Sequence, residues 1–344
     1  MLQSNGNVLS VGIDLGTSRS SVSVSNGQRQ VIDSYVGYPV DMVARKVLKK
    51  DVLVGRDALE YRSMVHLYRP LEEGLIKEGS EKDEAAVREL LNYLLRLAGA
   101  DANSRNGARV RAVVGVPAET LRTNKQQVRK AMAGLVDSLM IVSEPFAVAY
   151  GLEALLHTMI IDIGAGTTDF CVMKGRFPSE EEQRTLTTAG DWIDEQLFRL
   201  IQARHPEAKF SIHMVRDWKE QFSFVGEAPI TVRVTVPVEG RPTEIDITEE
   251  MRQACEGILP SMVETMIDLL SRVEPEYQER VRQNVILAGG SGLIGGLGAY
   301  LQKELNQVGG GRVRVVKDPI FSGSDGGLAI ALDAPDTDWE KLAA

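Results

Sequence analysis

The sequence predicts an α/β fold with two related lobes, and three observations support this prediction. Short apolar runs that end at a glycine or an aspartate recur along the chain, and segments with helical spacing of apolar residues lie between them. Strands that alternate with helices are typical of α/β proteins. One motif occurs twice, at 12–18 and 161–169, as an apolar strand, an aspartate and a turn of small and hydroxyl residues. Two copies about half a chain apart indicate two lobes that face one ligand.

The individual elements follow from the spacing of apolar residues. Apolar runs predict buried strands at 8–13, 113–116, 159–163 and 285–288. Helical spacing predicts helices at 84–97, 123–136, 191–203, 248–270 and 296–305. Pro145 suits the first turn of a further helix, which Ser143 would cap. Alternation of polar and apolar residues in 229–247 predicts an inserted hairpin with one solvent-exposed face.

Length, composition and charge narrow the class of protein. The 344 residues suit two domains, and a hydrophobic share of 43% with a charged share of 25% argues against a disordered chain or a rod. The 39 Lys and Arg against 48 Asp and Glu leave a net charge of −9, which disfavours a nucleic-acid partner. Two cysteines and four histidines provide neither a disulfide framework nor a metal-ligand cluster. We therefore expect Cys171 and Cys255 to be buried.

The N-terminal residues 1–7 give no sign of export or of a membrane anchor. They lack the basic and apolar regions of a secretory signal and the amphipathic pattern of an interfacial helix. No apolar run elsewhere reaches the ~18 residues of a membrane span. We therefore expect a cytoplasmic protein without a direct membrane anchor.

The two glycine turns are candidate phosphate-binding sites. A turn poor in side chains presents consecutive backbone N–H groups, which bind phosphate oxygens with the help of hydroxyls. The two turns are Gly16-Thr17-Ser18 and Gly164-Ala165-Gly166-Thr167. Asp14 and Asp162 stand at the strand ends, and Mg²⁺ prefers carboxylate and water oxygens when it bridges phosphates. A single strand and turn of this kind is common in α/β proteins. The occurrence of two such turns is what predicts a polyphosphate ligand.

A third turn, at 287–294, also closes a predicted buried strand. Its glycines would let a flat base approach the backbone, although a tight turn into a helix explains the same residues equally well. The chain has no Gly-x-x-x-x-Gly-Lys-Ser/Thr loop, and no Gly-x-Gly-x-x-Gly follows the first strand. The sequence therefore argues against the P-loop and dinucleotide-binding folds.

The three turns resemble the phosphate and adenosine motifs of the superfamily that contains actin, the seventy-kilodalton heat-shock chaperones and hexokinase-like sugar kinases. Segments 113–118, 317–319 and 326–327 fit the same pattern. Bacterial actins are most similar, because 143–151 resembles a helix start of the rod-shape MreB family and 216–222 resembles the actin segment that reaches the adenosine. Finer features at 36–39, 44–46, 219–226 and 316–319 look like the MamK family of magnetosome-associated actins. The chain departs from the rod-shape actins at Ala165, where those proteins carry glycine.

This resemblance implies an actin-like fold, with two duplicated lobes that each hold a mixed sheet flanked by helices and with ATP in the cleft between the lobes. Lobe I would comprise 1–155 and 322–344, with a small subdomain at about 34–64. Lobe II would comprise 156–321, with a small subdomain at about 190–247.

The resemblance also implies roles for single residues. Glu144 would orient the attacking water and Thr167 would assist near the γ-phosphate, while Asp14 and Asp162 would hold Mg²⁺, mainly through waters. The ATP or ADP would be bound by Gly16, Thr17, Ser18, Gly164, Ala165, Gly166, Thr167, Gly190, Asp191, Lys219, Glu220, Gly289, Gly290, Ser291 and Leu293. By their residue types alone, Glu144 could equally be a solvated residue at a helix start, and Lys219 with Glu220 could be a surface charge pair.

The implied function is that of an ATPase that polymerises head to tail into a cytoskeletal filament. The finer resemblance implies that the filament organises magnetosomes and has organelle-associated adaptor proteins as partners. The alternatives are a rod-shape cytoskeletal actin, or a sugar kinase or exopolyphosphatase-like enzyme of the same fold. A kinase needs a general base in a substrate pocket, and no acidic motif of the sequence is assignable to one.

Overall fold

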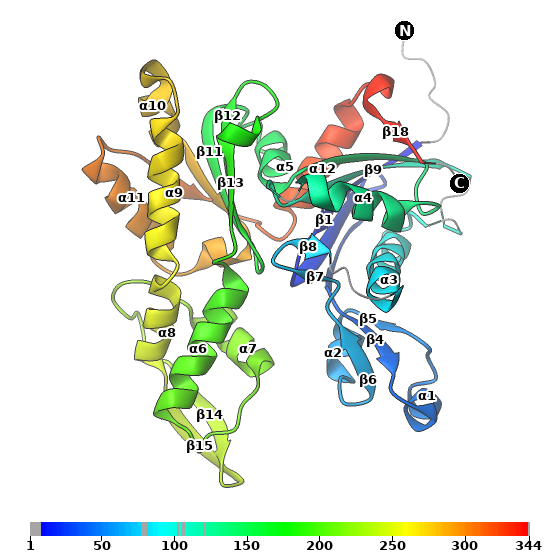
Figure 1. The fold of residues 1–344 in the computed structure, drawn as a ribbon, viewed down its shortest axis with the longest axis vertical. Coiled ribbons are helices and arrows are strands. Elements are labelled where there is room, and N and C mark those ends of the chain that lie inside the picture. The colour runs from blue at the N-terminus through cyan, green and yellow to red at the C-terminus, as the bar shows by residue number, and fades with distance from the viewer. Residues whose placement is uncertain (1–7, 77–80, 102, 105–106, 120, 343–344) are drawn as a thin grey trace. The chain divides into compact units, whose positions relative to one another are not determined.

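The computed structural model describes residues 8–76, 81–101, 103–104, 107–119 and 121–342 (Figure 1). The expectations for residues 1–7 lie outside this range. The chain divides into two compact units. Unit 1 comprises Met1–Leu156, Gly175–Glu180 and Asp318–Ala344, and unit 2 comprises His157–Lys174 and Glu181–Lys317.

Unit 1 is built on a mixed six-stranded sheet. Its strand order is β18 (Glu340–Lys341), β10 (Ser138–Ser143), β9 (Arg109–Val116), β1 (Val8–Leu15), β2 (Arg19–Val24) and β3 (Arg29–Asp33). The three strands β1, β9 and β10 run parallel, with Asp14 opposite Gly115 and Gly115 opposite Val142. The carboxyl ends of these three strands therefore meet at one edge of the sheet.

Four helices accompany this sheet: α3 (Glu81–Leu97), α4 (Leu121–Met132), α5 (Glu144–Gly151) and α12 (Ser322–Asp333). Glycines allow α12 to pack directly on its neighbours. A Cβ at Gly12 of β1 would lie 2.0 Å from the carbonyl oxygen of Ser324, and one at Gly326 would lie 1.8 Å from that of Ala147. Any larger residue at these positions would push α12 away from β1 or α5.

A smaller part of unit 1 has its own core. It contains a three-stranded sheet of β4 (Val36–Pro39), β5 (Leu53–Val54) and β6 (Val65–Tyr68), with the short helices α1 (Met42–Leu48) and α2 (Arg56–Glu60). Tyr35, Leu53, Ala58 and Val65 form its buried cluster. A two-stranded hairpin, β7 (Leu71–Glu72) and β8 (Leu75–Ile76), follows.

Unit 2 is built on a five-stranded sheet in the order β13 (Gln183–Leu186), β12 (Thr168–Lys174), β11 (Leu156–Ile163), β16 (Val285–Ala288) and β17 (Val313–Val315). The strands β11, β16 and β17 run parallel, and β13 is antiparallel to β12. Its helices are α6 (Gly190–Arg204), α7 (Ile212–Phe222), α8 (Thr248–Glu256), α9 (Leu259–Ser271), α10 (Pro275–Arg282) and α11 (Leu297–Gln307). One hydrophobic cluster joins the sheet to these helices.

The predicted strands and the hairpin are confirmed. Strands β1, β9, β11 and β16 contain the four predicted apolar runs. The hairpin consists of β14 (Arg233–Val238) and β15 (Arg241–Asp246), in which Val234 and Val236 are buried while Thr235 is exposed. Both cysteines are buried, as expected.

Two helix predictions were wrong in extent. The segment 248–270 forms two helices, α8 and α9, because Pro260 has no N–H for a continuous helix and its ring would clash with the carbonyl of Glu256. The helix predicted at 123–136 ends at Met132, since Gly134 has a φ of +74° and leaves the helical conformation. Ser143 is the N-cap residue of α5, but its side chain makes no capping hydrogen bond.

Candidate functional site

Two predicted acidic residues lie at the same edge of the sheet in unit 1. Asp14 is near the end of β1, and Glu144 follows directly on β10 as the first residue of α5. Gly115 of β9 lies between them, opposite Asp14 in the sheet, and a Cβ on it would lie 3.4 Å from Cγ of Glu144. Crevices at the carboxyl ends of parallel strands are where α/β proteins bind ligands. The fold thus brings Asp14 and Glu144 to the same edge of the sheet.

The first glycine turn, 16–18, is held in place from three sides. Ser34 donates its hydroxyl to the carbonyl oxygen of Gly16 at 2.7 Å, and its backbone N–H donates to Ser18 at 2.8 Å. Arg69 donates from Nε to the carbonyl oxygen of Thr17 at 3.0 Å. The Thr17 hydroxyl is buried and accepts from the backbone of Gly74 at 3.3 Å. Because the carbonyls are occupied by these donors, the conformation of the turn is fixed.

Asp14 lies against the first turn of α12. A Cβ on Gly323, the second residue of that helix, would lie 2.8 Å from Oδ2 of Asp14. Burial raises the pKa of the Asp14 carboxyl to about 6. A carboxylate that is costly to ionise without a ligand is suited to bind a cation, because the cation would stabilise the charged form.

The second glycine turn, 164–167, is linked to two other segments of unit 2. Gly164 donates to the carbonyl oxygen of Thr167 at 2.9 Å, which closes the turn. The carbonyl oxygen of Gly164 accepts from the backbone of Gly190 at 3.1 Å and from the hydroxyl of Ser291 at 3.1 Å. Asp191 donates its N–H to the carbonyl oxygen of Ala165 at 2.7 Å. The start of α6 and the turn after β16 are therefore fixed against the second turn.

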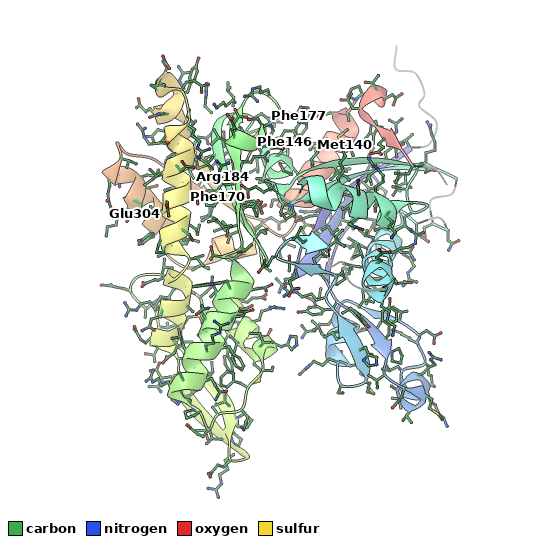
Figure 2. The ribbon with its side chains drawn as sticks, viewed as in Figure 1. Met140, Phe146, Phe170, Phe177, Arg184 and Glu304 are labelled. Carbon is green, nitrogen blue, oxygen red and sulfur yellow. The ribbon has the colours of Figure 1, made fainter. Side chains whose placement is uncertain are left out.

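The alanine at position 165 causes no backbone strain. It is not among the non-glycine residues with positive φ, so its methyl group fits an ordinary backbone conformation. The turn leads into β12, whose Phe170, labelled in Figure 2, is fully buried in the core of unit 2. The departure from the glycine of rod-shape actins is thus accommodated.

Asp162 is placed as Asp14 is, beside a glycine. It lies opposite Ala288 in the parallel pair of β11 and β16. The next residue, Gly289, has a φ of +75°, and a Cβ on it would lie 2.4 Å from Oδ1 of Asp162. The short 3₁₀ helix η2 (Gly290–Leu293) follows, and Leu293 is exposed. The third predicted turn therefore approaches the second acidic residue within the same unit.

Lys219 is not part of a surface charge pair, and that alternative was wrong. The side chain is buried, and its Nζ donates to the carbonyl oxygen of Gly190 at 2.7 Å and contacts Oδ1 of Asp194 at 2.7 Å. Arg216 of the same helix contacts Asp194 at 3.1 Å and Asp191 at 3.1 Å. Glu220 is exposed. The buried position follows from α7 packing on α6, which spacing along α7 alone does not reveal.

Asp194 is a residue that the sequence analysis missed. Its side chain is 1% exposed, and burial raises its pKa, while Lys219 and Arg216 oppose that rise. A signal was present: Asp191 and Asp194 are three residues apart on α6, as are Arg216 and Lys219 on α7. Residues at this spacing lie on one face of a helix, so two acidic and two basic residues can face each other.

Within the described part of the chain, no group of three His, Cys, Asp or Glu side chains could hold a metal ion by itself. Over the same residues, no helix is both long enough and apolar enough to cross a membrane. One aspartate, Asp14 or Asp162, lies beside each glycine turn, and hydrogen bonds from neighbouring segments hold the backbone of each turn.

Comparison with known proteins identifies the family. The family model described as MreB/Mbl protein matches residues 8–337. The chain belongs to the MreB/Mbl family. The actin-like protein MamK of Paramagnetospirillum magneticum is 40% identical to this chain, over 98% of this chain and 96% of the relative. The actin-like protein MamK of Magnetospirillum gryphiswaldense is 41% identical, over 98% of this chain and 92% of the relative. The cell shape-determining protein MreB of Pasteurella multocida is 24% identical over 92% of this chain and 91% of its own.

Solved structures agree with membership of the MreB/Mbl family. A MamK double helical filament matches with a TM-score of 0.92 and 40% identity, over 96% of this chain and 100% of the other. A non-polymerising MamK mutant bound to AMPPNP matches with a TM-score of 0.72 and 40% identity, over 95% and 99%. The actin-like fold with mixed sheets is therefore confirmed, as is the resemblance to MamK first and MreB next.

Proposed function

We propose that this chain binds ATP with Mg²⁺, polymerises head to tail into a filament and hydrolyses the ATP to ADP and phosphate as the filament turns over. The observation that best supports this is the match to a MamK double helical filament over nearly the full length of both chains. A further relative of the same identity was solved with AMPPNP, a nucleotide analogue. The match to a filament favours this function over that of a sugar kinase or phosphatase.

The nucleotide contacts that we propose are the predicted ones. Both glycine turns are fixed by neighbouring segments, so their backbone can bind phosphate without reorganisation. We assign the adenosine to the residues of the third turn together with Lys219 and Glu220. Lys219 has three N–H donors; one donates to the carbonyl oxygen of Gly190 at 2.7 Å, and the ammonium contacts Asp194 as an ion pair at 2.7 Å. That both glycine turns bind the same nucleotide stays a prediction.

The acidic residues fit Mg²⁺ better than a cation that needs a complete protein cage. Asp14 and Asp162 each lie near a strand end, and the described residues include no group of three His, Cys, Asp or Glu side chains that could hold a metal ion. Mg²⁺ usually keeps several waters and takes its remaining ligands from one or two carboxylates and the phosphates. When bound, Mg²⁺ would neutralise charge on the phosphates. Asp14 and Asp162 would orient its waters.

For hydrolysis we propose that Glu144 orients the attacking water and that Thr167 assists near the γ-phosphate. Glu144 is fixed at the first turn of α5, whose next five residues are buried. Phosphoryl transfer depends mainly on positioning and on charge stabilisation, so a carboxylate at the start of a well-packed helix suits this role.

An exposed apolar surface supports self-assembly. Helix α1, within the small subdomain proposed at 34–64, buries only Ala44, while Met42 is 84% exposed and Val43 is 62% exposed. Exposed apolar patches often mark protein interaction sites. Subunits that join through two different surfaces form open filaments. We propose α1 as part of one such surface, and magnetosome-associated adaptors as further partners on the resemblance to MamK.

A sedimentation experiment tests this function. The purified chain is centrifuged at high speed with Mg²⁺ and ATP, beside a sample without nucleotide, and the pellet is viewed by negative-stain electron microscopy while phosphate release is measured. Filaments with phosphate release are expected. Protein that stays in the supernatant and hydrolyses ATP only with an added sugar or polyphosphate would contradict the proposal.

The α1 surface is tested in the same assay. A Met42→Ser/Val43→Ser double variant should stay in the supernatant, because it removes apolar area that assembly would bury. Leu97→Ser is the matched control, since Leu97 is also an exposed apolar residue of unit 1 but lies at the end of α3. Equal pelleting of both variants would exclude α1 from the interface.

A further inference from the structure

We infer that Asp194 is a positioning residue of the nucleotide site: it fixes the start of α6 against the second glycine turn through Lys219 and Arg216. This inference rests on the proposed function, since it assigns to one buried carboxylate a part in binding the nucleotide phosphates. Asp194 itself would not touch the nucleotide.

Two routes lead from Asp194 to the start of α6. In the first, Oδ1 of Asp194 contacts Nζ of Lys219 at 2.7 Å, and the same ammonium donates to the carbonyl oxygen of Gly190 at 2.7 Å. In the second, Oδ2 of Asp194 accepts from Nε of Arg216 at 3.1 Å, while Nη2 of Arg216 reaches Asp191 at 3.1 Å. Asp194 therefore orients both cations, and each cation holds one of the first two residues of α6.

Gly190 and Asp191 are also the residues that form hydrogen bonds with the second glycine turn. Gly190 donates to the carbonyl oxygen of Gly164 at 3.1 Å and Asp191 to that of Ala165 at 2.7 Å. A Cβ on Gly190 would lie 2.8 Å from Oγ of Ser291 and 3.2 Å from Cα of Ala165, so the backbones are in close contact. A shift of the α6 start would thus move both the second turn and the third.

The burial of Asp194 is difficult to explain by stability alone. Removing two charges from water costs about as much as their attraction returns, and buried ion pairs are often replaceable by apolar residues without loss. A carboxylate that is 1% exposed and contacts two cations instead gives fixed directions to both side chains. Such fixed geometry is what phosphate binding by a backbone turn requires.

The same helix offers a matched control. Arg204, the last residue of α6, pairs with Glu250 of α8 at 2.7 Å, and the Glu250 side chain is 7% exposed. This pair also links α6 to a neighbouring helix and also contains a buried carboxylate, but it lies at the far end of α6 from the turn. Substitution of Glu250 therefore reproduces the loss of an ion pair made by a buried carboxylate, without affecting residues 190 and 191.

The experiment measures the affinity for Mg²⁺–ADP by isothermal titration calorimetry for the wild type, Asp194→Asn and Glu250→Gln, with a thermal unfolding curve of each. ADP is chosen because we expect ATP to favour assembly. The Kd should rise about tenfold in Asp194→Asn and change less than about twofold in Glu250→Gln. The unfolding temperatures of both variants should fall. If Asp194→Asn does not fold, Arg216→Gln, which leaves the Lys219 route intact, should raise the Kd by about threefold.

The outcomes separate this inference from the proposed function. If the wild type binds Mg²⁺–ADP and the Asp194 and Arg216 variants bind as tightly as Glu250→Gln, the positioning role is wrong and the nucleotide site stands. If the wild type binds no adenine nucleotide, the proposed function fails, and the inference fails with it.

Discussion

The buried carboxyl of Asp14 should make the nucleotide-free protein less stable at neutral pH than a variant without the charge. Burial raises the pKa of Asp14 to about 6 from an ordinary value of 3.8. Each pKa unit corresponds to ~1.4 kcal/mol, so ionisation of Asp14 costs the folded state at most ~3 kcal/mol. Because Asp14 as a whole residue is only half-buried, we expect Asp14→Asn to raise the free energy of unfolding by less than this limit, by about 2 kcal/mol at pH 7.5.

The sign of the effect fixes its dependence on pH. A carboxyl group with a raised pKa in the folded state favours folding while it is protonated, and this contribution is lost as the pH rises from about 4 to about 6. The stability difference between Asp14→Asn and the wild type should therefore vanish near pH 4 and reach its full size above pH 7. Urea unfolding in EDTA without nucleotide, followed by circular dichroism at several pH values, measures it.

Asp246→Asn provides a control of opposite sign. Hydrogen bonds from the side chain and backbone of Thr248 lower the pKa of Asp246, so its substitution should reduce stability at neutral pH. An Asp14→Asn variant that is equal to or less stable than the wild type at pH 7.5 would refute the reasoning. With Mg²⁺ and ATP the order should reverse, because the wild type alone retains the carboxylate that we assign to the cation.

Three further predictions concern the glycine turns, hydrolysis and assembly. Gly289→Ala should cost about 1 to 3 kcal/mol of stability and weaken nucleotide binding, since φ is +75° and the new methyl would lie 2.4 Å from the Asp162 carboxylate. Gly290→Ala, whose new methyl would meet no residue beyond its chain neighbours within 4 Å, should be close to wild type in thermal unfolding. Glu144→Ala should bind ATP normally but release phosphate about 10² to 10⁴ times more slowly, and its filaments should persist in a turnover assay. The Met42→Ser/Val43→Ser variant should retain phosphate release at low protein concentration while pelleting is lost, which a combined assay would detect.

Much of the local structure was predictable because its causes are local. A glycine turn, a run of apolar residues or a strand-ending aspartate determines the conformation of its own segment, so β1, β11, β16 and their turns were predicted. Apolar spacing continues from α8 into α9 and so predicts a single helix over 248–270, whereas Pro260 interrupts it. The roles of Glu144, Thr167 and the nucleotide contacts stay predictions.

The sequence by itself determined the strand ends, the three turns and the family, because these depend on residues that are neighbours in the chain. Only the tertiary structure decided which distant residues lie beside the acidic groups. Gly323, from the other end of the chain, lies so close to Asp14 that a Cβ there would collide with it, and α7 brings Lys219 and Arg216 to Asp194 on α6. The physical reason is that helix packing decides whether a charged residue is buried and paired, and the spacing of residues within one helix shows only which of them share a face.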